Sequence, residues 1–171
     1  MTTLEVRNLR KNFGDVAALT DVSLTVQPGE IYGFVGSNGA GKSTTMRIIL
    51  GVLAADAGEV LWDGKLITAD NRRNIGYMPE ERGLYAKEKI LDQLVFLARL
   101  HGLGAQEATT NAQRLLEQLG LAERTTSQLT DLSLGNQQRV QLAASLVHNP
   151  DVLVLDEPFS GLDPIAVQVM S

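Results

Sequence analysis

Residues 36–43 have the residue types and the spacing that bind phosphate groups. They read Gly-Ser-Asn-Gly-Ala-Gly-Lys-Ser and match the P-loop pattern in full, directly after an apolar run at residues 31–35. Glycines let backbone N–H groups approach phosphate oxygens without a Cβ clash, and the start of the following helix adds partial positive charge. We expect Lys42 to reach the β- and γ-phosphates of a nucleotide, and the Ser43 hydroxyl to ligate Mg²⁺. A glycine-rich turn with a surface lysine is the alternative. The residues expected to contact the nucleotide here are Gly36, Ser37, Asn38, Gly39, Ala40, Gly41, Lys42, Ser43 and Thr44.

Two adjacent acids, Asp156 and Glu157, end an apolar run at residues 152–155. Parallel strands place ligand sites at their carboxyl ends. We therefore expect Asp156 to face the Mg²⁺ shell, and Glu157 to act as the base that polarises the attacking water. The alternative is a solvated acidic pair at the end of a strand, which the complete phosphate loop elsewhere in the chain disfavours.

A third segment, residues 132–139, reads Leu-Ser-Leu-Gly-Asn-Gln-Gln-Arg and resembles the signature motif of ABC ATPases. Residues 156–158 and 160–163 follow it and look like the end of that family's Walker B strand and its D-loop. The order and spacing of these motifs extend over nearly the whole chain, from Leu4 to Pro164. The chain is identified by this resemblance as an ABC-type ATPase domain.

The signature segment has a physical reading of its own, because a Ser-x-Gly turn at a helix start is an anion site. The resemblance implies a head-to-tail dimer in which Ser133 and Gly135 of one subunit hold the γ-phosphate bound at the other subunit's P-loop. Two ATP molecules would be enclosed in this way. An ordinary helix N-cap at Ser133 or Gly135 is the alternative. By the same resemblance Asn136, which replaces the family's usual glutamine, and Asp163 also belong to the nucleotide site.

Two further positions carry over from the family. Phe13 stands where the family has an aromatic ring stacked on adenine, although a place in the core is the alternative. Glu80 stands where the family usually has a glutamine; its carboxylate can approach Mg²⁺ or a metal-bound water, but it adds negative charge and loses an amide donor. Residues 76–85 resemble the subfamily that is paired with ABC-2-type permeases.

The pattern of apolar residues predicts an α/β fold. We expect a P-loop core with a mostly parallel sheet, an antiparallel β region near the N-terminus and an inserted α-helical subdomain. The chain is predicted to be a single domain, incomplete at its C-terminus, with the core at residues 1–85 and 149–171 and the helical subdomain at about 86–148. Strands are predicted at residues 4–9, 16–26, 31–35, 58–63, 74–78 and 152–155, and helices at 44–52, about 87–104, about 108–120 and 135–148.

The composition limits the classes of partner. A formal net charge of −5 disfavours a broad nucleic-acid surface, which normally needs a basic face. The absence of cysteine excludes disulfides and thiolate metal sites. No run of about 20 apolar residues is present, so any membrane-spanning part is expected on another chain.

The resemblance implies an enzyme that hydrolyses ATP, with ATP and Mg²⁺ as ligands and Lys42 and Glu157 as catalytic residues. We expect it to be the motor subunit of an ABC transporter, of the ABC-2 exporter type, paired with a second nucleotide-binding subunit. A transmembrane permease would hold it on the cytoplasmic face of the membrane. A soluble ABC ATPase of translation or DNA maintenance, a non-hydrolysing ATP-gated module and a generic P-loop kinase are the alternatives.

One functional residue of the family has no counterpart. The family's switch histidine should follow the D-loop helix, and no histidine follows Asp156. His101 and His148 stand elsewhere and read as ordinary surface or helix-end residues. We therefore expect the 171-residue piece to bind ATP weakly, or to be unstable, and to hydrolyse ATP poorly.

Overall fold

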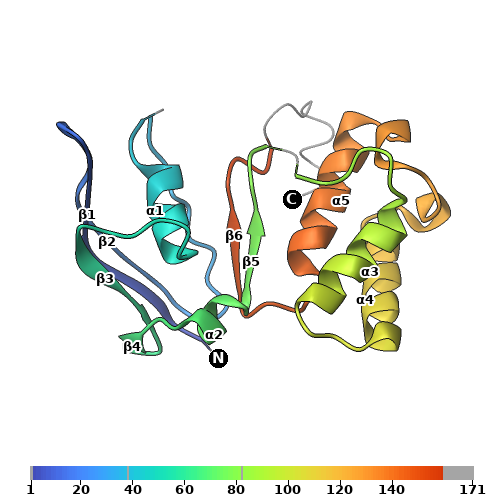
Figure 1. Cartoon of the computed structure of the whole chain (residues 1–171), viewed down its shortest axis with the longest axis horizontal. Coiled ribbons are helices and arrows are strands. Elements are labelled where there is room, and N and C mark those ends of the chain that lie inside the picture. The colour runs from blue at the N-terminus through green and yellow to red at the C-terminus, as the bar shows by residue number, and fades with distance from the viewer. Residues whose placement is uncertain (1, 38, 82, 160–171) are drawn as a thin grey trace. The chain divides into compact units, whose positions relative to one another are not determined.

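The computed structural model describes residues 2–37, 39–81 and 83–159 (Figure 1). The chain forms two compact units, Met1–Ile75 and Gly76–Ser171, which are described one at a time. Within the described ranges, no helix is both long enough and apolar enough to cross a lipid bilayer.

The first unit is built on a four-stranded sheet in the order β2-β1-β3-β4, with every neighbouring pair antiparallel. β1 (Leu4–Phe13) and β2 (Val16–Val26) form a hairpin, and β3 (Ala57–Trp62) pairs with the other edge of β1. The two-residue β4 (Lys65–Leu66) extends β3. The predicted antiparallel β region is therefore confirmed.

Two helices complete this unit: α1 (Lys42–Ile49) directly after the phosphate loop, and the one-turn α2 (Ala69–Arg72). Since every second strand residue points to the same face of a sheet, the apolar alternation of β1 and β3 supplies one buried layer. The buried hydrophobic residues of the unit include Leu4, Val6, Leu9, Leu19, Ile48, Ile49, Val60, Leu61 and Trp62.

The carboxylate of Asp56 is hydrogen-bonded to the C-terminal end of β1. It accepts hydrogen bonds from Lys11 Nζ and from the backbone N–H of Asn12, both at 2.7 Å. The hydrogen bond from Lys11, and then that from Asn12, lower the pKa of Asp56 below its usual value. This contact holds the strand where its pairing with β3 ends.

The strand predicted at residues 31–35 is not formed. The run has no regular secondary structure, and Ile31 and Val35 are 98% and 93% exposed. An apolar run becomes a buried strand only where neighbouring strands satisfy its backbone N–H and C=O groups. Within the described part of the chain, no strand pairs with this run.

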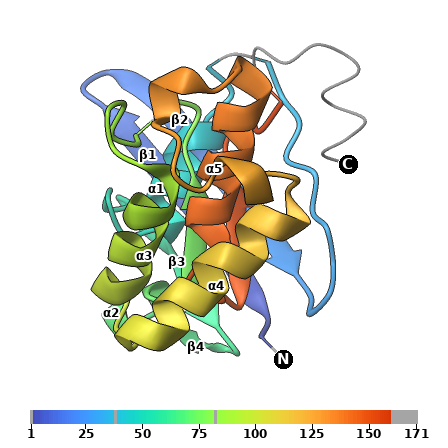
Figure 2. The same cartoon turned by 90° about the vertical axis from the view of Figure 1, so that its right-hand side faces the viewer.

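The second unit contains a helical bundle made of α3 (Ile90–Leu100), α4 (Ala105–Gln118) and α5 (Leu134–Leu146) (Figure 2). Two short 3₁₀ helices, Ala122–Arg124 and Leu129–Asp131, join α4 to α5. The apolar residues that repeat at helical intervals face one another, which confirms the three helices predicted for this region. The core of the bundle includes Ile90, Leu94, Ala98, Ala108, Ala112, Leu116, Val140, Ala143 and Val147.

Two strands of this unit, β5 (Ile75–Met78) and β6 (Val152–Leu155), form a two-stranded sheet and run in the same direction (Figure 1). β6 is only partly buried although all four of its residues are apolar, and Leu153 is 37% exposed. α5 lies directly against β5, because a Cβ on Gly76 would collide with the backbone oxygen of Ser145 and lie 2.9 Å from Pro150 Cγ. Together the two units confirm the predicted α/β fold class.

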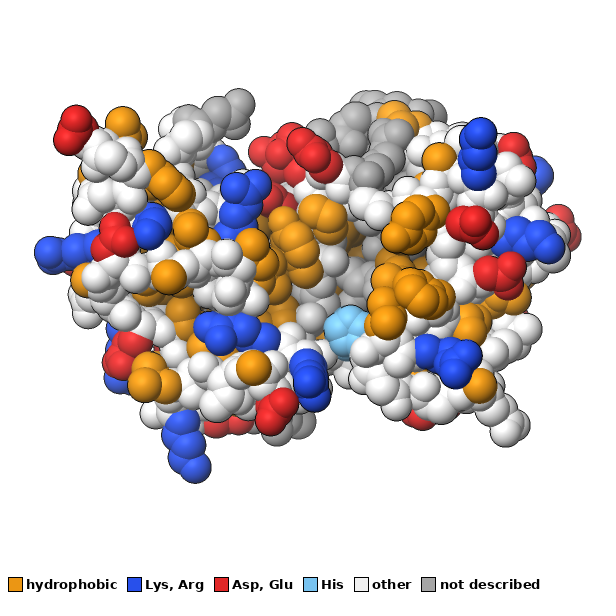
Figure 3. All heavy atoms as spheres, in the orientation of Figure 1, with side chains coloured by type: hydrophobic (Ala, Val, Ile, Leu, Met, Phe, Trp, Pro, Cys, Tyr) orange, Lys and Arg blue, Asp and Glu red, His pale blue; other side chains and the backbone are white. Residues whose placement is uncertain are grey.

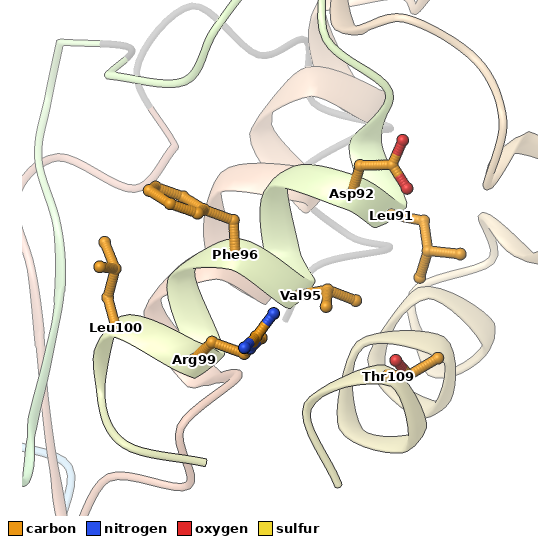
Figure 4. A pocket seen from close by; sticks show the side chains of 7 residues that line it. All are labelled: Leu91, Asp92, Val95, Phe96, Arg99, Leu100 and Thr109. Atoms are coloured by element: carbon orange, nitrogen blue, oxygen red, sulfur yellow. The ribbon is translucent and has the colours of Figure 1, made fainter. Parts of the chain in front are cut away.

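A shallow pocket of about 580 Å³ lies between α3 and α4 (Figure 4). Its lining is mixed, with mainly apolar side chains and the charged groups of Asp92 and Arg99. The lining residues are Leu91, Asp92, Val95, Phe96, Arg99, Leu100 and Thr109.

The two histidines lie at helix ends, as predicted. The imidazole rings of His101, which follows α3, and His148, which follows α5, stack with centroids 3.8 Å apart. The pair joins the C-terminal ends of the two helices.

Candidate functional site

The phosphate loop turns into α1 at a residue that only glycine can occupy. Gly41, the N-cap of α1, has φ 83° and ψ 7°, the left-handed conformation that glycine adopts readily. A Cβ at Gly41 would meet the Leu19 side chain and lie 2.7 Å from the backbone oxygen of Ala18. The packing of the loop against β2 therefore requires the glycine of the motif. Asn38 lies outside the described residues.

The start of α1 is left open to an anion. No side chain caps its N-terminus, and its first turn carries no acidic residue. Lys42 Nζ donates to the backbone oxygens of Gly36 and Ser37, at 2.6 and 3.1 Å, so the ammonium group lies over the loop. Because these acceptors are neutral carbonyls, a phosphate oxygen would be the stronger acceptor for this cation.

Ser43 and Thr44 continue α1 and are partly buried. The next residue, Thr45, is buried, and its hydroxyl donates to the backbone oxygen of Gly41 at 2.9 Å. Ser43 directly follows Lys42 in the first turn of α1, and its side chain carries a hydroxyl group. A hydroxyl oxygen is a hard ligand of the kind that Mg²⁺ prefers.

In the second unit, the two acids after β6 differ sharply in environment. Asp156 is 6% exposed, and its backbone N–H donates to the Met78 oxygen at 2.9 Å, whereas Glu157 is exposed. Glu157 also has φ 50°, a left-handed conformation that is uncommon outside glycine and often marks a functional residue. The buried acid suits a metal ligand, and the exposed acid suits a base that must reach water.

The segment that carries Glu80 follows β5, the strand beside β6. Glu80 is exposed, and the backbone on either side of it is held: the Pro79 and Glu81 oxygens accept from Gln141 Nε2 at 2.7 and 3.2 Å. Asp156 and Glu80 therefore follow the carboxyl ends of neighbouring strands, where parallel sheets place ligand sites. Within the described residues, no three or more His, Cys, Asp or Glu side chains gather into a metal cluster.

The signature segment begins α5. Ser133 is its N-cap, and the Ser133 hydroxyl accepts from the backbone N–H of Asn136 at 3.4 Å. This N-cap contact is the alternative considered for Ser133, but 3.4 Å is long for such a bond. The hydroxyl and the N–H groups near Gly135 could therefore turn to a phosphate oxygen instead.

Phe13, the expected adenine-stacking residue, ends β1. The ring is 52% exposed and Lys11 Nζ lies 5.8 Å from its centroid. The exposure argues against a place for Phe13 in the core and leaves a ring face open to solvent. Asp163 lies outside the described residues.

Sequence reasoning did not single out two glutamines of α5, Gln138 and Gln141. Each is 4% exposed, and each donates to a backbone carbonyl of a segment that follows a strand. The sequence carries no signal for this role: the two amides, one helical turn apart, lie on the face of α5 opposite Val140 and Ala143, where they read as the polar face of an amphipathic helix.

The sequence matches a known family over most of its length. Residues 19–160 match the ABC transporter family model. The chain is 42% identical, over 98% of its length, to the uncharacterized ABC transporter ATP-binding protein YhaQ of Bacillus subtilis, of which it covers 56%. It is 38% identical, again over 98% of its length, to the lipopolysaccharide export system ATP-binding protein LptB of Escherichia coli, of which it covers 72%.

The fold agrees with solved structures. The structure of cbiO1 from Clostridium perfringens, described as part of the ABC transporter complex cbiONQ, superposes with a TM-score of 0.87 at 30% identity. That match covers 98% of this chain and 70% of cbiO1. The chain spans between about half and three fifths of the length of the first curated relatives that it matches. The family model, the relatives and the fold agree, and the chain belongs to the ABC transporter family as an ATP-binding domain.

Proposed function

We propose that this chain binds ATP with Mg²⁺ and, within its full-length protein, hydrolyses ATP to drive a transporter. The observation that supports this most directly is the loop before α1. A left-handed Gly41, an uncapped helix start and the Lys42 ammonium over neutral carbonyls are together suited to a nucleotide's phosphates.

The chain's own residues divide the chemistry. Lys42 and the N–H groups of the loop neutralise negative charge on the phosphates. The Ser43 hydroxyl and the Asp156 carboxylate supply hard oxygen ligands for Mg²⁺. When bound, this ion would offset negative charge on the phosphate oxygens. Glu157 accepts the proton of the attacking water. Glu80 approaches the metal or its water.

The site is completed by a second nucleotide-binding subunit. Ser133, Gly135 and Asn136 of that subunit would contact the γ-phosphate, and Asp163 would lie near the same junction. The long cap contact at Ser133 supports this, because the hydroxyl is weakly engaged within its own helix. Phe13 would stack on the adenine, which its exposed ring permits.

The transporter role rests on family membership and on relatives such as LptB, whose name states an export system. We propose an ABC-2-type exporter in which a permease holds this chain on the cytoplasmic face of the membrane. On the face drawn in Figure 3, hydrophobic side chains gather over the helices of the second unit among charged ones. Exposed Tyr85 and Phe96 belong to that unit, which supports a protein-binding surface there. The division into a core and a helical subdomain at about residues 86–148 remains a prediction.

The full-length protein carrying Lys42→Ala or Glu157→Gln tests the nucleotide chemistry. Lys65→Ala and Glu123→Gln, both at exposed positions, are the matched controls. We expect Lys42→Ala to weaken ATP binding by about tenfold or more, because a charge-assisted contact is lost. We expect Glu157→Gln to keep ATP binding, slow phosphate release by about a hundredfold or more, and accumulate an ATP-bound dimer.

Normal phosphate release by Glu157→Gln would remove Glu157 as the base. Unchanged ATP affinity in Lys42→Ala would remove the loop as the phosphate site. A membrane protein encoded beside this sequence should copurify with the chain and alter its ATPase rate. Copurification with ribosomes or DNA in its place would favour the soluble ATPase.

A further inference from the structure

We propose that Gln138 and Gln141 are positioning residues that bind the two acid-bearing segments, at Glu80 and Glu157, to helix α5. The proposal rests on the function proposed above. Gln138 Nε2 donates to the Pro158 oxygen at 2.8 Å, next to Glu157. Gln141 Nε2 donates to the Pro79 and Glu81 oxygens, on either side of Glu80.

The two contacts have the same construction. Both glutamines are 4% exposed, and both side-chain amides donate hydrogen bonds to a segment outside α5. Both segments follow a strand of the β5-β6 sheet, and both acceptors include a proline. A proline has no N–H, so its own backbone nitrogen cannot donate to a neighbouring strand. The glutamine amide fixes the proline carbonyl instead.

An apolar side chain would fill the same space but would not do this. The opposite face of α5 is apolar, and Val140, Ala143 and Val147 are fully buried there. A part-buried carbonyl that lost its donor would be left without a protein partner, and the segment that carries it would move toward water. The amides therefore determine where the two segments lie, beyond filling the core.

Helix α5 also begins within the signature segment, with Ser133 as its N-cap. An α-helix rises about 1.5 Å per residue, so Gln138 lies roughly 8 Å along the axis from Ser133, and Gln141 one turn further. Within this unit, one helix therefore carries the N-cap residue Ser133 and both glutamine contacts. One contact is with the backbone beside Glu157, and the other is with the backbone beside Glu80. A displacement of α5 would move both acids.

Glu157 depends on this most. Its left-handed backbone, φ 50°, persists only where the surroundings hold it. The Gln138 contact holds the carbonyl group of the next residue, Pro158. Loss of that contact should misplace the base without touching the phosphate loop, which lies in the other unit.

The test uses the full-length protein with Gln138→Met and Gln141→Met, which keep side-chain length and remove the donor. Gln113→Met, at an exposed position of α4, is the matched control. We expect kcat for ATP hydrolysis to fall by about tenfold in Gln138→Met, with KM and the ATP dissociation constant within about twofold of wild type. A merely structural role would lower the melting temperature and leave kcat per folded molecule unchanged, and that result would overturn the proposal.

Gln138→Glu gives a second readout. A neutral carboxyl can donate to the Pro158 oxygen and a carboxylate cannot, so the ratio of variant to wild-type kcat should rise as the pH is lowered from about 8 to about 6. A ratio that does not change with pH counts against the positioning role.

Hydrogen exchange without nucleotide keeps the two proposals separate. In Gln138→Met, exchange should rise at the amides of Glu157 and Phe159, and in Gln141→Met at residues 80–81, with no rise at residues 36–43. Unchanged exchange in these segments would sink the positioning role even if the protein had no ATPase activity. An inactive wild type with the expected exchange pattern would instead refute only the proposed function.

Discussion

Replacement of Gly41 by alanine should lower the free energy of unfolding more than any other change of glycine to alanine in or near the phosphate loop. Two terms add up. An alanine at φ 83° costs roughly 1–2 kcal/mol relative to glycine. The new Cβ would also meet the Leu19 side chain and lie 2.7 Å from the Ala18 oxygen, an overpacking that costs about 1–3 kcal/mol. We expect a loss of about 2–5 kcal/mol in the free energy of unfolding.

Two neighbouring glycines separate these terms. Gly39 has φ 84°, and a Cβ there would meet nothing within 4 Å, so Gly39→Ala should cost only the backbone term of roughly 1–2 kcal/mol. Gly33 has no positive φ and equally open space, so Gly33→Ala should change stability by less than about 0.5 kcal/mol.

Urea unfolding of the full-length protein measures all three variants, with the midpoint compared at constant m. The expected order of stability loss is Gly41→Ala, then Gly39→Ala, then Gly33→Ala. An equal loss at Gly41 and Gly39 would show that the contact with Leu19 and Ala18 does not enforce the glycine. A loss at Gly33 as large as the others would refute the backbone argument itself.

Two more predictions concern contacts outside the loop. Gly76→Ala should lower the free energy of unfolding by about 1–3 kcal/mol in the same assay, because its Cβ would press on the Ser145 oxygen and separate α5 from β5; Gly83→Ala, in open space, is the control. Asp56→Asn should be less stable than wild type at neutral pH, because the hydrogen bonds from Lys11 and Asn12 favour the charged form and lower the pKa of Asp56. That stabilisation is present above the usual aspartate pKa of about 3.9 and is lost as the pH falls through the lowered pKa, so the two proteins should converge there. A stability difference that stays constant down to the most acidic pH would rule out the charge of Asp56 as its cause.

The parts of the fold that depend on local pattern could be predicted from the sequence. The alternation in β1 and β2, the helical spacing in α3 and α5, and the glycines of the phosphate loop each act over a few residues. The run at residues 31–35 was mispredicted because a buried strand needs partners that its own sequence does not specify.

In the candidate site, too, some features could be predicted from the local sequence and others could not. The residue types at Lys42, Asp156 and Glu157 indicate their chemistry without coordinates. The buried amides of Gln138 and Gln141 could not be assigned, because their carbonyl partners lie 20 and 62 residues away in sequence. The left-handed backbone of Glu157 was equally hidden, since glutamate has no preference for that conformation.

The exposed run Ile-Tyr-Gly-Phe-Val at residues 31–35 has a consequence for handling the protein. It carries no charge and no proline, and its two terminal residues are almost fully accessible. Segments of this kind recruit the backbone of other molecules and begin β-aggregation. We expect this 171-residue chain to precipitate at high concentration, and a lysine introduced at Val35 to keep it in solution.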